Sequence, residues 1–583
     1  MGSEVSAVTE TYIPRGKATA AEKALGRRTD LRGRGEPALW SLGGALAIGM
    51  IMILGFLVLV FYNGIATFIP KPIAVVTETG GHITAGEPFR SETFHPPAEE
   101  VAALSTDWQA RIKSAGGMMN RTLYRVGNFD VYGEDFRWVA DYAVAKTEYP
   151  AGMVFVERME WGPFIGSVKA LTVDGNAQPF KSLDDSAFLA AHQQALDRAA
   201  EIRDIERDQI GDVNHRLERE RLALRKVELA EGRASPAYRE AQNRLNTLSA
   251  TLQRDYDTLS AQVAKLREAS ARNTLTLAAV GGEEKTIEFA ALVRIYPAND
   301  LGFWGKVGVY LSRWGEFLGG EPREANTEGG VFPAIFGTAA MTLLMVVVVA
   351  PFGVITALYL REYAKQGRLV SFVRISVNNL AGVPSIVYGV FGLGFFAYVL
   401  GGSIDALFYP ERLPSPTFGT GGLLWSVLTL ALLTVPVVIV ATEEALAAVP
   451  RSMREGSLAC GASKWQTIKY IVLPRAMPGV MTGVILAMAR GAGEVAPLML
   501  VGVVKLAPEL PIDGIFPFVH LERSFMHLGF HIFDVGFQSR NAEAGKPMVF
   551  VTTVLLIALV TIVNAAAIIL RNRLKRRFAG SQF

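Results

Sequence analysis

The sequence predicts an α-helical integral membrane protein with six membrane-spanning helices and an inserted α+β domain outside the membrane. Three observations lead to this fold class. Half of the 583 residues are apolar, 19% are charged and the mean hydropathy is +0.26, a balance too apolar for an ordinary soluble protein and too polar for a chain lying wholly in the membrane. The apolar residues gather in long runs, and lysines and arginines gather near the ends of those runs.

Six apolar runs are long enough to cross a bilayer. They cover residues 38–62, 331–360, 379–401, 421–441, 477–503 and 547–570. The first run resembles a secretory signal peptide, but its apolar core is too long and starts too far into the chain. A retained membrane anchor is therefore expected.

The distribution of cations predicts the orientation of the spans, because lysine and arginine concentrate on the cytoplasmic side. Basic residues dominate the N-terminal tail, the loops after the second and fourth runs, and the C-terminus, whereas the loop 402–420 has one arginine and the loop 504–546 is slightly acidic. Six spans with both termini in the cytoplasm of a bacterial inner membrane satisfy this pattern. The predicted domains are a basic tail at 1–37, a first transmembrane helix at 38–62, a periplasmic α+β domain at 63–325 and a core of five helices at 326–583.

The polar stretch between the first two runs is long enough for one folded domain. Strand-like patterns occur at 153–161, 167–173, 274–279 and 286–296, and Gly281-Gly282 joins the last two as in a hairpin. The sequence therefore predicts a small sheet built from the two ends of this domain.

Residues 186–272, between the strand pairs, are rich in Ala, Leu, Glu, Arg and Gln. Leucines recur at near-heptad spacing, and Pro236 interrupts the run. A helical hairpin or coiled coil is expected. A purely structural role is favoured over a docking arm for a periplasmic partner or a neighbouring subunit.

Several function classes find no support in the sequence. The chain has no phosphate-binding loop, so ATP must be bound by a partner, and no catalytic constellation or cofactor motif is present. The net charge of +3 gives no reason to expect nucleic-acid binding, and the single cysteine, Cys460, excludes an intrachain disulfide. His520, His527, His531 and Asp534 could ligate a metal, but a polar surface or interface role is favoured, and no metal site is predicted.

Arg490 and Glu494 are the notable charged residues inside an apolar run, where ionisable side chains are costly. Four residues apart, they lie on one helical face and can form an ion pair. The planar guanidinium can present several donors to an oxyanion, and the glutamate can hold it ready. The alternative is a pair that only neutralises itself against a neighbouring helix.

The predicted cytoplasmic segment 443–476 has a gapped pattern of small and apolar residues. Its positions are Glu455, Gly461, Ile471, Leu473 and Pro474. The pattern resembles the EAA loop through which permeases of ABC importers contact their ATPase. A plain amphipathic loop is the alternative.

The run Ala489-Arg-Gly-Ala-Gly-Glu-Val-Ala-Pro-Leu498 resembles the corresponding span of PstA-type permeases of phosphate ABC importers. The segments 329–338 and 381–392 resemble that family too. The resemblance covers about 325–583 and implies phosphate import along a path that includes Arg490 and Glu494. It also implies three partners in the bilayer complex: a PstC-type permease, a dimer of PstB-type ATPases and a periplasmic PstS-type binding protein. Two alternatives remain, a permease for another oxyanion (sulfate, molybdate or phosphonate) and a membrane sensor or scaffold.

Overall fold

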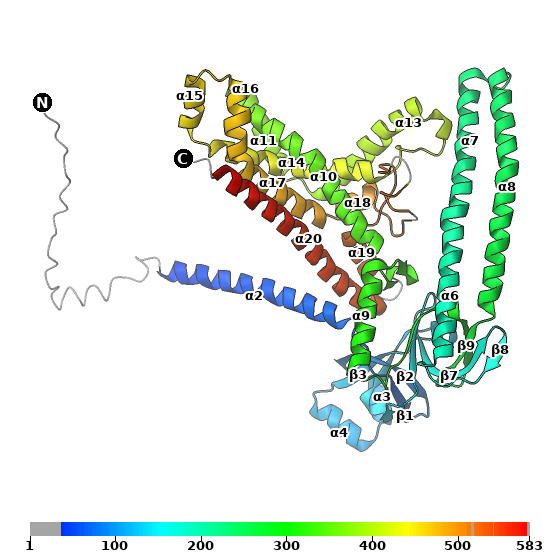
Figure 1. Ribbon diagram of the computed structural model, residues 1–583. Helices are drawn as coiled ribbons and strands as arrows, with labels where there is room; N and C mark the ends of the chain where they lie inside the picture. The colour runs from blue at the N-terminus through cyan, green and yellow to red at the C-terminus, as the bar shows by residue number, and fades with distance from the viewer. Residues whose placement is uncertain (1–35, 508, 515–517, 540–541, 580–583) are drawn as a thin grey trace, which may run out of the picture. The chain divides into compact units, whose positions relative to one another are not determined.

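The computed structural model describes residues 36–507, 509–514, 518–539 and 542–579 of the chain (Figure 1). The basic tail predicted for residues 1–37 lies, up to residue 35, outside the described residues. The chain divides into two compact units, Met1–Asn63 and Gly64–Phe583. Most of helix α2 (Glu36–Ala66) belongs to the first unit, and every other element described below belongs to the second.

Six helical segments in the described part of the chain are long and apolar enough to cross a membrane. They are Leu39–Ala66, Phe332–Tyr363, Ser385–Phe408, Leu423–Ala447, Lys464–Gly493 and Ala542–Arg573. Each overlaps one of the six apolar runs, so the predicted integral membrane fold with six spans is confirmed.

Two spans end elsewhere than the apolar runs predict. The third begins at Ser385, because Pro384 separates it from an amphipathic helix, α11 (Arg368–Leu380). The fifth ends at Gly493 instead of continuing to 503, since Glu494 leaves the helix in an extended conformation. It also begins earlier than predicted, at Lys464.

The membrane core consists of short and long helices in sequence. They are α10 (Phe332–Leu358), η5 (Tyr359–Tyr363), α11, α12 (Ser385–Phe391), η6 (Gly392–Gly401), α13 (Gly402–Phe408), η7 (Pro410–Arg412), α14 (Leu423–Ala447), α15 (Arg451–Ala459), α16 (Lys464–Thr467), η8 (Ile468–Val472), α17 (Leu473–Gly493), α18 (Ala496–Val501), α19 (Leu528–Phe533), η9 (Asp534–Gln538) and α20 (Ala542–Ala579). Helices α10, α14 and α17 share one apolar core, in which Met345, Leu430 and Ala487 are fully buried. These three helices therefore form the centre of the permease-like part.

The α+β region contains two antiparallel sheets. The first has the order β4-β3-β2-β1-β5, with β1 (Ala74–Glu78), β2 (Ile83–Phe94), β3 (Met119–Arg125), β4 (Phe136–Ala140) and β5 (Val144–Glu148). The second has the order β10-β9-β7-β6-β11, with β6 (Val154–Arg158), β7 (Phe164–Val173), β9 (Thr274–Ala278), β10 (Glu284–Glu288) and β11 (Leu292–Pro297), and β8 (Asn176–Gln178) pairs with β7. Short helices accompany them: α3 (Ala98–Ala103), α4 (Thr106–Ser114), α5 (Phe129–Tyr132), η1 (Asp141–Ala143) and η3 (Phe289–Ala291).

The long helices predicted between the strand pairs are present. They are α6 (Ser186–Asp204), η2 (Ile205–Gln209), α7 (Ile210–Glu231) and α8 (Pro236–Ala271), and α7 lies beside α8 (Figure 1). Gly232 has a φ of +77°, and Ser235 Oγ accepts a hydrogen bond from the Tyr238 N–H, so the chain turns where Gly232 and Pro236 predict a break. Supercoiling of the two helices stays a prediction.

Helix α9 (Phe303–Gly319) follows the second sheet and leads into the hairpin of β12 (Pro322–Arg323), η4 (Glu324–Asn326) and β13 (Glu328–Gly329). This α9–hairpin segment is the covalent link from the α+β region to α10. Its position is set by buried polar contacts.

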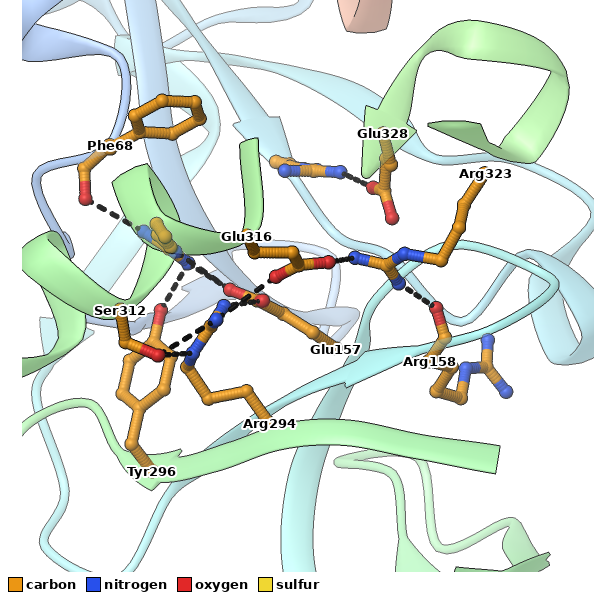
Figure 2. A network of polar contacts seen from close by, with 11 residues as sticks. Phe68, Glu157, Arg158, Arg294, Tyr296, Ser312, Glu316, Arg323 and Glu328 are labelled. Carbon is orange, nitrogen blue, oxygen red and sulfur yellow. Dashed lines mark hydrogen bonds and ion pairs between the residues drawn. The ribbon is translucent and has the colours of Figure 1, made fainter. Parts of the chain in front are cut away.

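Glu157 of β6 lies at the centre of these contacts (Figure 2). Its carboxylate accepts hydrogen bonds from Arg294 of β11 and from Nε of Arg313 of α9, the latter at 2.7 Å. Arg313 also donates to the Phe68 carbonyl at 3.1 Å and to the Tyr296 hydroxyl at 2.7 Å. One arginine thus joins the helix to two strands and to the segment before β1.

A second carboxylate extends the network toward the hairpin. Glu316 of α9 accepts from Arg294 at 2.9 Å and from Arg323 of β12, and Arg323 donates to the Arg158 carbonyl. We call Glu157, Arg294, Arg313, Glu316 and Arg323 the junction network. Their side chains are at most 22% exposed, so each charge is neutralised by a partner and not by water.

Two buried carboxyls at the junction network have pKa values shifted in opposite directions. Burial acts to raise the pKa of Glu157, but Arg313 and Arg294 outweigh it and hold this pKa below its ordinary value. Burial raises the pKa of Glu87, on β2, above its ordinary value despite Arg313, Arg125 and Lys71 nearby. Glu87 Oε1 is buried with no hydrogen-bond partner among the described residues.

This contrast gives a pH-dependent prediction for two variants. The ionised form of Glu157 stabilises the fold above the ordinary carboxyl pKa and loses that effect as pH falls through its lowered pKa. Glu157→Gln should therefore destabilise the protein by about 3–5 kcal/mol at pH 7. The sign reverses for Glu87, because its pKa is raised in the folded protein. Stability is therefore lost as the pH rises from the ordinary carboxyl pKa through the raised one.

Glu87→Gln should thus raise the thermal midpoint at pH 7 and leave it nearly unchanged at pH 4. The measurement is amide hydrogen exchange of β-strand peptides in the purified full-length protein during heating. A lower midpoint for Glu87→Gln at pH 7 would show that its charge stabilises the junction.

Candidate translocation site and coupling segment

Arg490 and Glu494 meet at the end of α17. Arg490 Nε lies 3.5 Å from Glu494 Oε1, and the two side chains are 34% and 20% exposed. Glu494 has φ −80° and ψ 132°, so it is the first residue after the helix and not part of its interior. The predicted ion pair is present, and it lies at a break between α17 and α18.

The residues after Glu494 explain the break. Pro497 lies at the start of α18 and lacks the N–H that would continue the α17 hydrogen-bond ladder. Gly389 of α12 packs closely against Pro497, since a Cβ built on this glycine would lie 2.7 Å from the Pro497 Cα. The break is therefore buttressed by a neighbouring helix.

The two glycines between the charged residues have different surroundings. A Cβ at Gly491 would lie 2.5 Å from the Met345 sulfur of α10, whereas a Cβ at Gly493 would meet no atom within 4 Å. Gly491 thus permits close packing of two helices. Gly493 leaves open space beside Glu494.

Among the described residues the Arg490 side chain has no hydrogen-bond partner apart from the long ion-pair contact with Glu494. A guanidinium carries five N–H donors in a planar fork. Most of these donors therefore remain available to a bound anion, and the carboxylate offsets the positive charge in its absence.

The segment predicted at 443–476, called the coupling segment below, begins at the end of α14 and continues into α15, an exposed helix that contains Glu455. Gly461 follows with a φ of +85°, the left-handed conformation expected of a sharp turn. Ser463 and Gln466 then form a capping box that starts α16, and Ser457 Oγ lies 2.9 Å from Thr467 Oγ1, which ties α15 to α16.

Ile471, Leu473 and Pro474 lie inside the fifth span, although the apolar run that predicted this span starts only at residue 477. The span runs without interruption from Lys464 to Gly493. A π-helical turn, η8, precedes α17, and Pro474, which has no N–H to donate, is the second residue after it. Residues 464–476 of the coupling segment therefore belong to the span itself.

Two ion pairs near this segment were missed by sequence reasoning. Arg454 of α15 binds Glu362 at 3.0 Å, and Arg374 of α11 binds Glu443 of α14 at 3.1 Å. The partners lie about 70 to 90 residues apart, and no periodicity links them. They fix α15 against η5 and α11 against α14.

The histidines near the last span also differ from expectation. His527 and His531 are 1% and 2% exposed, so they lie in the interior and not on a polar surface. Burial lowers the pKa of each to about 4, which keeps both neutral at physiological pH. No group of three or more His, Cys, Asp or Glu suited to a metal ion occurs among the described residues.

Comparison with known proteins places these features in a wider context. Residues 349–576 match the family model described as "Binding-protein-dependent transport system inner membrane component". The chain is 41% identical over 175 residues to the phosphate transport system permease protein PstA 1 of Mycobacterium tuberculosis (strain CDC 1551 / Oshkosh), covering 30% of this chain and 52% of that protein.

Two Bacillus subtilis (strain 168) proteins are also similar. The probable ABC transporter permease protein YqgH is 35% identical over 199 residues, 34% of this chain and 60% of its own length. The probable ABC transporter permease protein YqgI is 31% identical over 221 residues, 37% of this chain and 69% of its own length. The chain thus spans between half and about two thirds of the curated relatives it matches.

A solved structure of the MetNI methionine ABC transporter aligns with 41% of this chain and 94% of its own chain. The identity is 19% and the TM-score is 0.32.

The surroundings of Gly491 and Gly493 give a matched pair of variants. Gly491→Val inserts a branched side chain where Met345 already packs, so it should lower stability by about 1–3 kcal/mol. Gly493→Val faces open space and should cost less than 1 kcal/mol, because the new side chain meets no atom and valine is no worse a helix former than glycine. Thermal midpoints of both purified variants in detergent test this, and equal midpoints would contradict the close packing of α17 on α10.

Proposed function

We propose that this chain, which belongs to the ABC-transporter permeases described as binding-protein-dependent transport system inner membrane components, carries inorganic phosphate through the cytoplasmic membrane. The membrane core is PstA-like in sequence, and the curated PstA relatives are named as phosphate permeases. The chain is a transporter subunit and not an enzyme.

The observation that carries the proposal is the Arg490–Glu494 pair at the α17–α18 break. Phosphate is tetrahedral, and a planar guanidinium can bind two of its oxygens with parallel hydrogen bonds. Glu494 competes weakly, at 3.5 Å, and can release the guanidinium when a more strongly charged anion arrives. The exposure of both side chains gives the anion access.

The break itself suits a translocation step. A helix interrupted inside the membrane frees backbone groups where they line a path, and the two halves can move relative to each other. Gly493 next to Glu494 leaves room for the anion. In this proposal the pair receives phosphate from the outer side and releases it inward as the helices around it rearrange.

The energy comes from a partner, since the sequence contains no phosphate-binding loop of its own. Helix α15 is exposed and contains Glu455, for which the described residues offer no ion-pair or hydrogen-bond partner. We propose that α15 sits in a groove of a PstB-type ATPase. A PstC-type permease and a PstS-type binding protein would complete the complex, with both termini of this chain in the cytoplasm and no bound cofactor.

The substrate role of Arg490 predicts a large loss in transport. In vesicles that contain the whole complex, Arg490→Ala should lower ATP-driven uptake of radiolabelled phosphate by about 100-fold, because two charge-assisted hydrogen bonds are lost. Arg490→Lys keeps the charge without the planar fork and should retain part of the uptake.

The matched control is Arg111→Ala, which removes an exposed arginine of α4 paired with Asp107. Its uptake should equal that of the unmodified complex. Normal uptake by Arg490→Ala would make the pair a structural one, and transport of sulfate in place of phosphate would show that the cargo is another oxyanion.

The coupling role of α15 predicts a different defect. Glu455→Lys should reduce uptake and release the ATPase from the complex or let it hydrolyse ATP without transport, since a reversed charge lies at the contact. Glu99→Lys makes the same charge change on α3, far along the chain from α15, and should leave both activities intact. Size-exclusion chromatography and ATP hydrolysis are the measurements, and unchanged coupling in Glu455→Lys would contradict the role of the segment.

A further inference from the structure

The hairpin β12–β13 joins the α+β region to the membrane core through its turn. Glu324, Ala325 and Asn326 all have positive φ values, 43°, 52° and 78°. Each such residue costs on the order of 1–3 kcal/mol and persists only where surrounding contacts hold it. Three such residues in succession indicate that contacts with the surrounding structure hold this turn in an unfavourable backbone conformation.

One side of the hairpin is held by the α+β region. Arg323 belongs to the junction network, and Glu328 accepts a hydrogen bond from Arg125 of β3 at 2.5 Å. Glu324 accepts from the Gly162 N–H at 3.0 Å. The two strands and the turn are therefore each tied to the sheets.

The tip of the turn is held by the membrane core. Asn326 is 1% exposed, and its Nδ2 donates to Asp534 Oδ2 at 3.0 Å and to the Lys505 carbonyl at 3.2 Å. Lys505 Nζ lies 3.1 Å from the same Asp534 oxygen. We call Asn326, Lys505, His531 and Asp534 the Asn326 cluster.

The Asn326 cluster adjoins α18, which follows Glu494 in the chain, and α19, which packs on Val495. Lys505 follows α18, whose chain begins directly after the break. Asp534 follows α19, and Gly529 of α19 packs so closely on Val495 that a Cβ there would lie 2.5 Å from its Cγ2. Asn326 thus binds the residues that follow two of the segments beside the candidate translocation site, Lys505 after α18 and Asp534 after α19.

The Asn326 cluster also contains buried polar atoms that make no hydrogen bond to the described residues. Asn326 Oδ1, Asp534 Oδ1 and both ring nitrogens of His531 are buried without a partner among the described residues. Buried polar atoms are costly when unpaired. They give the cluster the capacity for a second set of hydrogen bonds if α19 shifts relative to the hairpin.

We propose that Asn326 is a positioning residue through which the α+β region sets the placement of α18 and α19 around the Arg490–Glu494 pair. The chain of contacts runs from the junction network through Arg323 to Asn326, then to Asp534 and Lys505, and from α19 to Val495 beside Glu494. Displacement of the α+β region by an extracytoplasmic protein would reach the translocation site by this route. The proposal rests on the transport function proposed above.

The test exchanges the two partners of the central hydrogen bond. Asn326→Asp places two carboxylates together and should lower phosphate uptake per ATP hydrolysed by about tenfold, because one hydrogen bond is replaced by repulsion. Asp534→Asn alone loses the Lys505 ion pair and should also lower this ratio. The double variant N326D/D534N restores one amide and one carboxylate and should return to within about threefold of the unmodified complex.

Uptake and ATP hydrolysis are measured on the same vesicles and normalised to assembled complex. Asn176→Ala, at an exposed position on β8, is the control and should leave the ratio unchanged. An unchanged ratio in Asn326→Asp, or a loss that the double variant does not reverse, would overturn the proposal.

A second readout does not depend on the cargo. Amide hydrogen exchange of peptides covering 491–505 and 525–535 should accelerate in Asn326→Asp, whereas peptides of α15 and α16 should not change. Unchanged exchange in 491–505 would overturn the proposal whatever the complex transports. Failure of the unmodified complex to take up phosphate would instead count against the proposed function alone.

Discussion

The ion pairs of Glu157 with Arg294 and Arg313 are the constraint on which the arrangement of the second unit depends. These side chains are nearly inaccessible to solvent, and a buried ion pair of this kind adds little net stability compared with apolar packing. Its effect is on geometry, because separating the partners would leave a buried charge unpaired. Helix α9 therefore has one favourable position against β6 and β11, the one in which Arg313 reaches Glu157. The main-chain contact of the Val331 N–H with the Phe317 carbonyl then fixes where α10 begins after α9.

The same constraint determines what the hairpin can reach. Arg323 is held by Glu316 and by the Arg158 carbonyl, which leaves the three residues of the turn to bridge to the membrane core. The turn does so in a strained conformation, and Asn326 gains two buried hydrogen bonds there. The strained turn and its polar contacts are the observations on which the proposed transmission of a sheet movement rests.

The sequence was sufficient for features that depend on local pattern and insufficient for those that depend on distant partners. Six apolar runs predicted six spans, and Gly281-Gly282 predicted the β9–β10 hairpin, in which Gly282 has a φ of +97°. The strand predicted at 286–296 is two strands, because a turn at η3 buries Phe289 between β10 and β11. The junction network and the Asn326 cluster had no signal, since their partners lie up to about 210 residues apart and no short-range period connects them. The first sheet was not predicted either, although its strands β1 to β4 pair with their neighbours in the chain.

The candidate site illustrates why a correct pattern can still mislead about geometry. Arginine and glutamate four apart predicted a pair on one face of a continuous helix, yet Glu494 is extended and Pro497 opens a new helix. The pair therefore lies across a break between two helices instead of within one. The α17 side continues into η8, α16 and the coupling segment, whereas the α18 side leads to Lys505 and the Asn326 cluster. In the two proposals above, an ATPase acting on α15 and a protein acting on the α+β region would act on opposite sides of this break, which the 3.5 Å contact between Arg490 and Glu494 spans.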